Sequence, residues 1–184
     1  PYDVEWAERR EDKLVLRSGW EETASYLCIN LQGRVGHDHS DAGAVITYTD
    51  GGAVLLHDCS YIMRHHEFHN LLFVQDEDAP FARPSWPHSP ERFDYKPQTT
   101  FLVDLPNLVL CSFQSRDYFG YPIRHQRTVI FDKRRAPVIL HDRVLIREGV
   151  YQLGPIYHVA RVLTQGPHHF CTEQGAPHTQ SGIQ

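Results

Sequence analysis

The sequence lacks a long hydrophobic run, because no stretch of its 184 residues approaches the roughly 20 apolar residues that a membrane-spanning helix needs. Its first ten residues are also too polar for a secretory signal peptide. An excess of positive charge is missing as well: 18 Lys and Arg stand against 23 Asp and Glu, giving a formal net charge of −5. A protein that binds a phosphate backbone normally carries a basic stripe. These absences argue against a membrane span and against nucleic acid as a partner.

Cysteine is scarce and widely spaced. The four cysteines, Cys28, Cys59, Cys111 and Cys171, form no CxxC pair. This spacing excludes a zinc ribbon and a thioredoxin-type redox site. A chain of this length can bury a hydrophobic core without the help of disulfides or metals. Any metal in this protein would therefore serve chemistry or local order.

Helical signals are missing too, since the chain shows no heptad pattern, no internal repeat and no convincing amphipathic helix. Instead, short runs rich in Val, Ile, Tyr, Phe and Thr recur between turn residues, which is typical of strands. These runs cover residues 14–16, 24–29, 44–48, 53–56, 68–74, 101–103, 108–113, 128–131, 138–141 and 150–153. The pattern predicts an all-β protein with an antiparallel β-sandwich.

Turn and proline signals divide the chain. Asp50-Gly51-Gly52 separates two of the runs, and Asp-Gly favours a tight hairpin turn, so residues 44–48 and 53–56 should pair antiparallel. Residues 75–98 contain five prolines and little periodicity; because proline cannot donate to a sheet ladder, they predict a long surface excursion. We expect one sandwich domain over residues 1–170, followed by a polar, disordered tail over residues 171–184.

Histidine is the unusual residue, because the chain contains 13 and they are clustered. His37 and His39 are two residues apart and would face the same side of an extended backbone. The predicted hairpin returns Asp58 toward His39, and His69 opens the next run. Two imidazoles and one carboxylate suit zinc, with a water as fourth ligand, and the same set can hold non-haem iron. The sequence predicts a metal site and leaves the choice of metal open.

Two other histidine motifs fit the chain less well. His37-x-His39-x-Asp41 matches most of the HxHxDH pattern of metallo-β-lactamase-type hydrolases, but Ala42 stands at the last position and a β-run follows it. The HxH motif of amidohydrolases belongs to a barrel of alternating strands and helices, which this chain does not show. Asp41 can either orient His39 through its second ring nitrogen or bond the backbone within a turn.

Several motifs stand in a characteristic order along residues 14–160. They are Ser18-Gly19-Trp20, Tyr26-Leu27, GHDHSDAG from Gly36 to Gly43, GAVLLHD from Gly52 to Asp58, His69-Asn70 and, less specifically, Arg127 to Lys133 followed by residues 138–144. Their order and spacing resemble the β-sandwich module of heparinase II/III-like polysaccharide lyases.

The resemblance implies a supersandwich-like fragment of a larger two-domain lyase, in which an α/α toroid precedes the sandwich and a sugar cleft lies between them. Such enzymes cleave uronic-acid polysaccharides, glycosaminoglycans or alginate among them, by β-elimination: a base removes the C5 proton and the C4 oxygen departs. The site must neutralise the uronate carboxylate and stabilise the charge that develops. A polymeric substrate implies a periplasmic or extracellular protein.

The resemblance also implies roles for individual residues. The metal ligands, with zinc in a mainly structural site, would be His39, Asp58 and His69. The catalytic groups on the sandwich would be His37 and Tyr61. His37 would also bind the acidic sugar. Apart from the resemblance, Arg64 belongs to a basic edge that serves an acidic polymer if it faces the cleft, and Arg127 either reaches the sugar or lies on a solvated strand face. The main base and acid belong to the toroid, so this chain alone should have little or no lyase activity.

Two other functions fit the same residues. One is a non-catalytic, carbohydrate-associated sandwich whose metal only ties strands together. The other is an oxygenase or hydrolase that uses the two histidines and the carboxylate directly, which for an oxygenase requires iron with an open coordination position.

Overall fold

The structure, a computed structural model, describes residues 12–32, 41–58, 65–78, 97–135, 137–159 and 162–167, together with the backbone of 170–172. In this part of the chain the paired strands are all antiparallel. Helix there is limited to two short 3-10 turns, η1 (His66–Phe68) and η3 (Tyr118–Gly120). None of the described helices is long and apolar enough to cross a membrane. The predicted all-β fold is confirmed.

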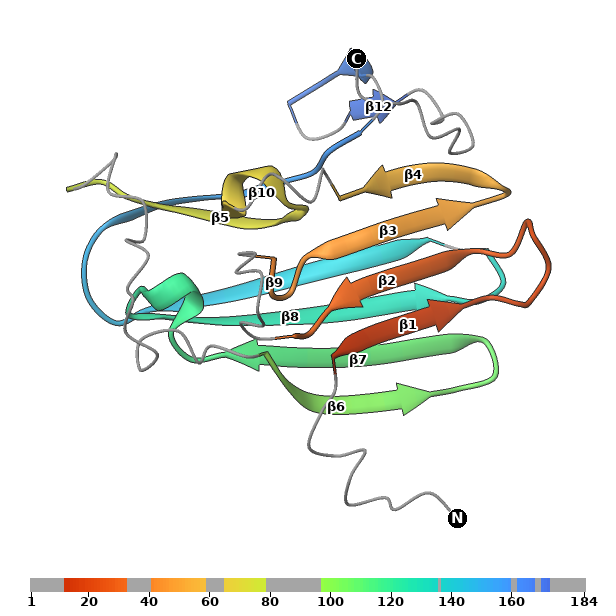
Figure 1. Cartoon of the computed structure of the whole chain (residues 1–184), viewed down its shortest axis with the longest axis horizontal. Helices are drawn as coiled ribbons and strands as arrows, with labels where there is room; N and C mark the ends of the chain where they lie inside the picture. The colour runs from red at the N-terminus through yellow and green to blue at the C-terminus, as the bar shows by residue number, and fades with distance from the viewer. Residues whose placement is uncertain are drawn as a thin grey trace.

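Two four-stranded sheets form the body of the protein (Figure 1). The β1–β4 sheet contains β1 (Lys13–Arg17), β2 (Tyr26–Asn30), β3 (Val45–Asp50) and β4 (Ala53–His57) in sequential order. The β6–β9 sheet contains β6 (Gln98–Asp104), β7 (Leu108–Ser115), β8 (Ile123–Asp132) and β9 (Val138–Ile146), also in sequential order. Two further pairs join β5 (Leu71–Asp76) to β10 (Tyr151–Ile156) and β11 (Val162–Gln165) to β12 (Phe170–Thr172).

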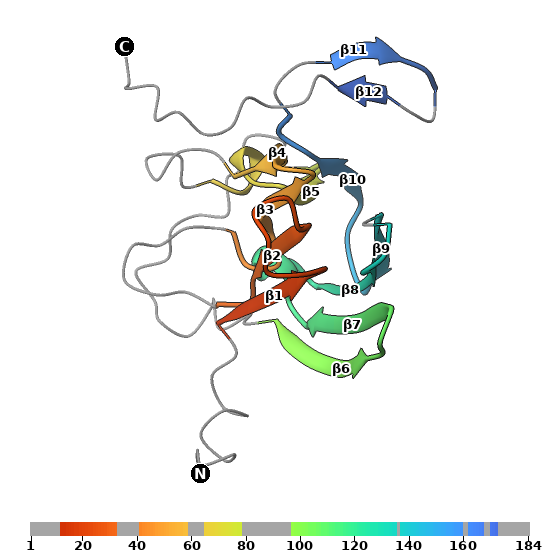
Figure 2. The ribbon, with the colours of Figure 1, turned by 90° about the vertical axis from the view of Figure 1, so that its right-hand side faces the viewer.

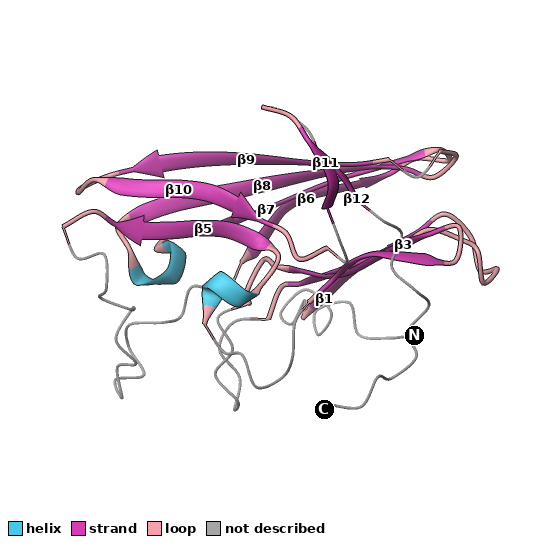
Figure 3. Ribbon diagram, turned by 90° about the horizontal axis from the view of Figure 1, so that it is seen from above, coloured by secondary structure: helices cyan, strands magenta, loops and turns pink. Residues whose placement is uncertain are grey.

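The two large sheets face each other as the layers of a sandwich (Figures 2 and 3). Side chains alternate between the two faces of a strand, and β8 shows this alternation along its whole length, with every second residue buried. The core between the layers contains Leu14, Leu16, Leu27, Ile29, Leu31 and Val45 on one side and Val109, Cys111, Phe113, Val129 and Phe131 on the other. The alternating apolar pattern thus produces the predicted antiparallel sandwich.

A second apolar cluster lies where β5 meets the connection between β7 and β8. Its buried members are Ala44, Leu71, Leu72, Val74, Tyr118, Phe119 and Ile123. Ala44 belongs to this cluster and its neighbour Val45 belongs to the core between the large sheets. The start of β3 is therefore the point at which the two apolar clusters meet.

The predicted β3–β4 hairpin is confirmed. Asp50 is paired with Ala53, so Gly51 and Gly52 alone form the turn, with φ angles of 57° and 82°. Positive φ at both central residues is the requirement of a type I′ turn, which glycine meets without strain. The turn residues are therefore Gly51-Gly52, one position later than the Asp-Gly pair suggests.

The proline-containing segment is shorter than predicted at both ends. β5 continues through Gln75 to Asp76, and β6 already begins at Gln98. Residues 79–96, between these strands, lie outside the described residues, as do residues 173–184 of the predicted tail.

Candidate functional site

A tight turn leads the chain into β3. The Ala44 amide donates to the Asp41 carbonyl at 2.9 Å, and Gly43 has a φ of +83°, as the third residue of a type II turn requires. The Gly43 amide donates to the Asn30 carbonyl of β2 at 2.7 Å. A Cβ atom on Gly43 would lie 3.4 Å from the ring of Phe113. The turn at 41–44 is thus held between β2 and the facing sheet.

Asp58 reaches the same place from β4. Its amide donates to the Ile46 carbonyl at 2.8 Å, which continues the β3–β4 ladder one residue beyond His57. The Asp58 side chain is only 9% exposed. Asp58 is therefore positioned by the second residue of β3.

His69 reaches the start of β3 from the other direction. Its neighbour Asn70 is fully buried and binds Val45 twice: the Asn70 carbonyl accepts from the Val45 amide at 2.9 Å, and Asn70 Nδ2 donates to the Val45 carbonyl at 3.0 Å. The Asn70 side-chain oxygen also accepts from the His158 amide after β10. The segments that carry Asp41, Asp58 and His69 thus all dock onto residues 43–46, which we call the β3 entry.

Asp58 and His69 touch each other at this point. His69 Nδ1 lies 2.8 Å from Asp58 Oδ1, and the two side chains are 2% and 9% exposed. Because a carboxylate only accepts, Nδ1 carries the proton of this hydrogen bond. Zinc accepts both carboxylate oxygens and imidazole nitrogens, so this pair has donor types of the predicted metal site. The structure therefore brings together two of the three predicted ligands.

The other predicted residues at the site are His37, His39, Tyr61 and Arg64. All four lie outside the described residues, so their roles remain predictions. Within the described ranges, no three His, Cys, Asp or Glu side chains gather closely enough to hold a metal ion. Asp41 is described, and its carbonyl closes the turn at 41–44.

Arg127 lies elsewhere than expected. Its side chain is completely buried between the sheets, so it faces neither an acidic sugar nor solvent. Nε and Nη2 donate to the two carboxylate oxygens of Asp142 at 2.7 and 2.9 Å, and Nη1 donates to the Gly43 carbonyl at 2.9 Å. The expectation that Arg127 binds substrate is corrected accordingly: its guanidinium is committed to interior partners.

Asp142 is the centre of a buried polar network that the sequence patterns did not reveal. His125 Nε2 donates to Asp142 Oδ1 at 2.8 Å, and the ring of Tyr118 lies 4.3 Å from that of His125. The Tyr118 hydroxyl donates to the Leu72 carbonyl of β5 at 2.9 Å. The sequence did contain one signal for this network. Asp142 stands at an inward position of β9, on the same face as Leu140 and Val144, where an apolar residue would be expected.

Electrostatics at this network favour the ionised carboxylate. Burial by itself would raise the pKa of Asp142, but the hydrogen bonds from His125 and Arg127 outweigh burial and hold that pKa well below its usual value. Burial lowers the pKa of His125; its hydrogen bond to Asp142 opposes this lowering, and the charge of Arg127 adds to it. The network therefore contains an Arg–Asp ion pair and a neutral His125.

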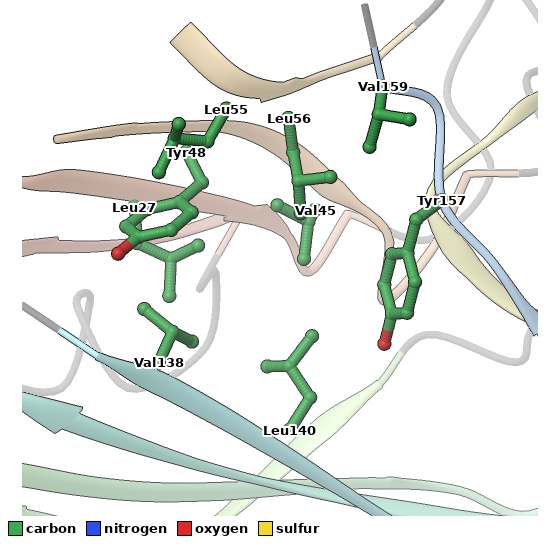
Figure 4. A pocket seen from close by; sticks show the side chains of 9 residues that line it. All are labelled: Leu27, Val45, Tyr48, Leu55, Leu56, Val138, Leu140, Tyr157 and Val159. Carbon is green, nitrogen blue, oxygen red and sulfur yellow. The ribbon is translucent and has the colours of Figure 1, made fainter. Parts of the chain in front are cut away.

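A cavity of about 340 Å³ lies between β3, β4 and β9 (Figure 4). Its described lining residues are Leu27, Val45, Tyr48, Leu55, Leu56, Val138, Leu140, Tyr157 and Val159. Aliphatic side chains dominate this lining, and these nine residues include neither a cation nor a carboxylate. The cavity is therefore poorly suited to an acidic sugar and is distinct from the Asp58–His69 pair.

Comparison with known proteins identifies a similar fold but does not identify a family. The architecture is an antiparallel β-sandwich with a buried His–Asp pair at one strand entry. No family model matches the chain, and no curated protein matches it. A solved structure with the same fold is a mutant of the heparan sulfate lyase HepC from Pedobacter heparinus, with a TM-score of 0.61 and 18% identity. The alignment covers 83% of this chain and 24% of that lyase, so the likeness concerns a β-sandwich part of a much longer enzyme.

Proposed function

We propose that this chain is the β-sandwich portion of a uronic-acid polysaccharide lyase of the heparinase II/III-like type, holding a zinc site and one wall of the substrate cleft. The observation that carries the proposal is the buried 2.8 Å contact between Asp58 and His69 at the β3 entry. The sandwich that surrounds this contact has the fold of part of a heparan sulfate lyase, which supports the same interpretation.

The metal ligands in this proposal are His39, Asp58 and His69. Zinc held by these residues would supply a cross-link between segments rather than a reactive water, because the three ligands come from three different segments of the sequence. The chain itself already positions two of them: the Ile46 carbonyl fixes the Asp58 backbone, and Val45 fixes Asn70 beside His69. His39 precedes the turn at 41–44 in the sequence, and this turn leads directly into β3.

The cleft residues in this proposal are His37, Tyr61 and Arg64. His37 and Arg64 neutralise the uronate carboxylate, which makes removal of the neighbouring C5 proton easier by stabilising the enolate-like charge. Tyr61 assists proton transfer to or from the sugar. Arg127 takes no part in binding, because its guanidinium is buried and paired. The main base and acid are supplied by an α/α toroid encoded upstream of this sandwich.

The test compares this chain with the protein that includes the upstream coding sequence. Both are mixed with heparan sulfate, alginate and neutral dextran, and the ultraviolet absorbance of unsaturated product is followed. We expect the longer protein to release unsaturated product from an acidic polymer and not from dextran, while this chain alone releases little or none.

Three outcomes would contradict the lyase proposal. An upstream reading frame without helical repeats removes the toroid on which the chemistry depends. Retained binding to acidic polymers by the longer protein, with no product, favours the non-catalytic sandwich. Iron in place of zinc, together with oxygen consumption, favours the oxygenase.

A further inference from the structure

The Arg127 guanidinium connects the β3 entry to the opposite sheet. Nη1 donates to the carbonyl of Gly43, which lies 84 residues away in the sequence. The amide of Gly43 is bound by Asn30 of β2. Both backbone polar groups of Gly43 are therefore fixed, one from its own sheet and the other by a side chain of β8.

The orientation of this guanidinium is set by Asp142. Arg127 and Asp142 are directly paired across β8 and β9, and the carboxylate binds Nε and Nη2 together. This two-point contact fixes the plane of the guanidinium and directs Nη1 at Gly43. His125 donates to the same carboxylate and holds it from a neighbouring position on β8. A lysine has a single nitrogen and cannot make all three contacts in this geometry.

Packing alone does not explain a charge at this position. The inward residues that follow Arg127 on β8, Val129 and Phe131, are apolar and completely buried. A buried ion pair costs desolvation free energy, and an apolar replacement of similar size is often at least as stable. The feature that an apolar side chain cannot reproduce is the hydrogen bond to the Gly43 carbonyl.

We propose that Arg127, oriented by Asp142 and His125, is a positioning residue for the metal site. By fixing the Gly43 carbonyl it sets the turn at 41–44, through which the chain that follows His39 enters β3. This inference rests on the proposed zinc site. It adds to that site a residue on the opposite sheet that positions the ligands without being a ligand itself.

The test uses the whole chain loaded with Co²⁺, whose visible absorption reports the geometry of its ligands. The main variant is Arg127→Met with Asp142→Asn, which removes both charges together and leaves neither one stranded. We expect Co²⁺ affinity to fall by about tenfold, the lower end for loss of a residue that supports ligands, and the spectrum to change. In the metal-free protein, the amides of Gly43 and Ala44 should exchange with solvent faster than in the wild type.

Val129→Ala is the matched control, because Val129 is buried on the same face of the same strand and its side chain has no polar atom that could bind Gly43. It should lower stability while leaving Co²⁺ affinity, spectrum and Gly43 exchange unchanged. Arg127→Lys is the second variant in case the double variant does not fold; it keeps the charge and should still weaken Co²⁺ binding.

Each outcome decides between the two proposals. Wild-type affinity and spectrum in a folded double variant, or in Arg127→Lys, overturn the positioning role and leave the zinc site standing. A wild-type chain that binds no Co²⁺ and no Zn²⁺ overturns the site itself. Equal weakening by Val129→Ala would show that general destabilisation, rather than Gly43, is responsible.

Discussion

At the scale of single residues, the Arg127–Asp142 pair is the most consequential feature of the interior. Removing one member leaves the other as an uncompensated charge inside the sandwich, which typically costs about 3–5 kcal/mol. We expect Arg127→Met to lower the free energy of unfolding by about that amount, and the addition of Asp142→Asn to recover much of it. Urea denaturation of the two variants measures the difference. Equal losses in both would show that the ion pair is not what the interior depends on.

Two buried histidines make a second prediction at this scale. Burial lowers the pKa of both His66 and His125, and each donates through Nε2, His66 to the Val74 carbonyl and His125 to Asp142. Below about pH 6.5 the unfolded chain binds protons that the folded chain does not, so stability falls as pH drops from that value. The Asp142 carboxylate, with its lowered pKa, loses its contribution only in stronger acid.

The measurement for the histidines is the urea midpoint at about pH 7.5 and about pH 5.5. We expect a lower midpoint at the acidic value. His66→Gln keeps a side-chain amide that can donate to Val74 and removes one titrating group, so its midpoint should depend less on pH. A pH dependence as steep as that of the wild type would exclude His66 as a source.

The residue scale is also where the sequence was least informative. Arg127 and Asp142 meet because β8 and β9 pair in one particular register. The sequence pattern of either strand alone does not specify which residue of the other strand lies opposite. The contact between Asp58 and His69 was easier to foresee, because a tight hairpin brings Asp58 back toward the histidine cluster and His69 lies two residues before β5. Burial of Arg127 required knowledge of which face of β8 points inward.

At the scale of elements, the β3–β4 hairpin follows from local rules. Gly51 has a φ of +57°, and a Cβ atom added there would meet nothing within 4 Å, so replacement by alanine is opposed only by backbone strain. We expect Gly51→Ala to cost about 1–2 kcal/mol, the cost of a left-handed conformation for an L-residue. Gly154→Ala in β10 is the control, since Gly154 also has open space but no positive φ.

Urea unfolding of the two glycine variants separates the backbone strain at Gly51 from the other effects of replacing a glycine by alanine. Gly154→Ala should be close to neutral. A loss at Gly51 no larger than at Gly154 would mean that the turn can change type without cost.

Strand positions were largely recoverable from the sequence, because apolar and β-branched runs bounded by turn residues define them. The ends of the strands were harder to predict from the sequence. The predicted run at 68–74 begins only at Leu71, since η1 occupies residues 66–68. β8 starts five residues before its predicted run because the polar residues Arg124 and Gln126 alternate with buried ones and hide the pattern. The pairing of β5 with β10 depends on tertiary packing and has no local signal.

At the scale of the whole molecule, a common sandwich carries a specific arrangement at one strand entry. The fold likeness to a heparan sulfate lyase extends over 83% of this chain, yet a fold hosts many functions and the chemistry lies in the site. In this sandwich three segments dock on residues 43–46, and two of them bring Asp58 and His69 into contact. The proposed function therefore depends on whether His39 completes a metal site with this pair.

The most direct measurement of this claim is the metal content of the purified chain by elemental analysis, together with Zn²⁺ affinity by chelator competition. We predict one Zn²⁺ per chain, lost in His39→Ala and in His69→Ala. His141→Ala, at an exposed position on β9, should retain it. A wild-type chain without stoichiometric metal, or His39→Ala and His69→Ala variants that bind Zn²⁺ as tightly as His141→Ala, would contradict the proposed site.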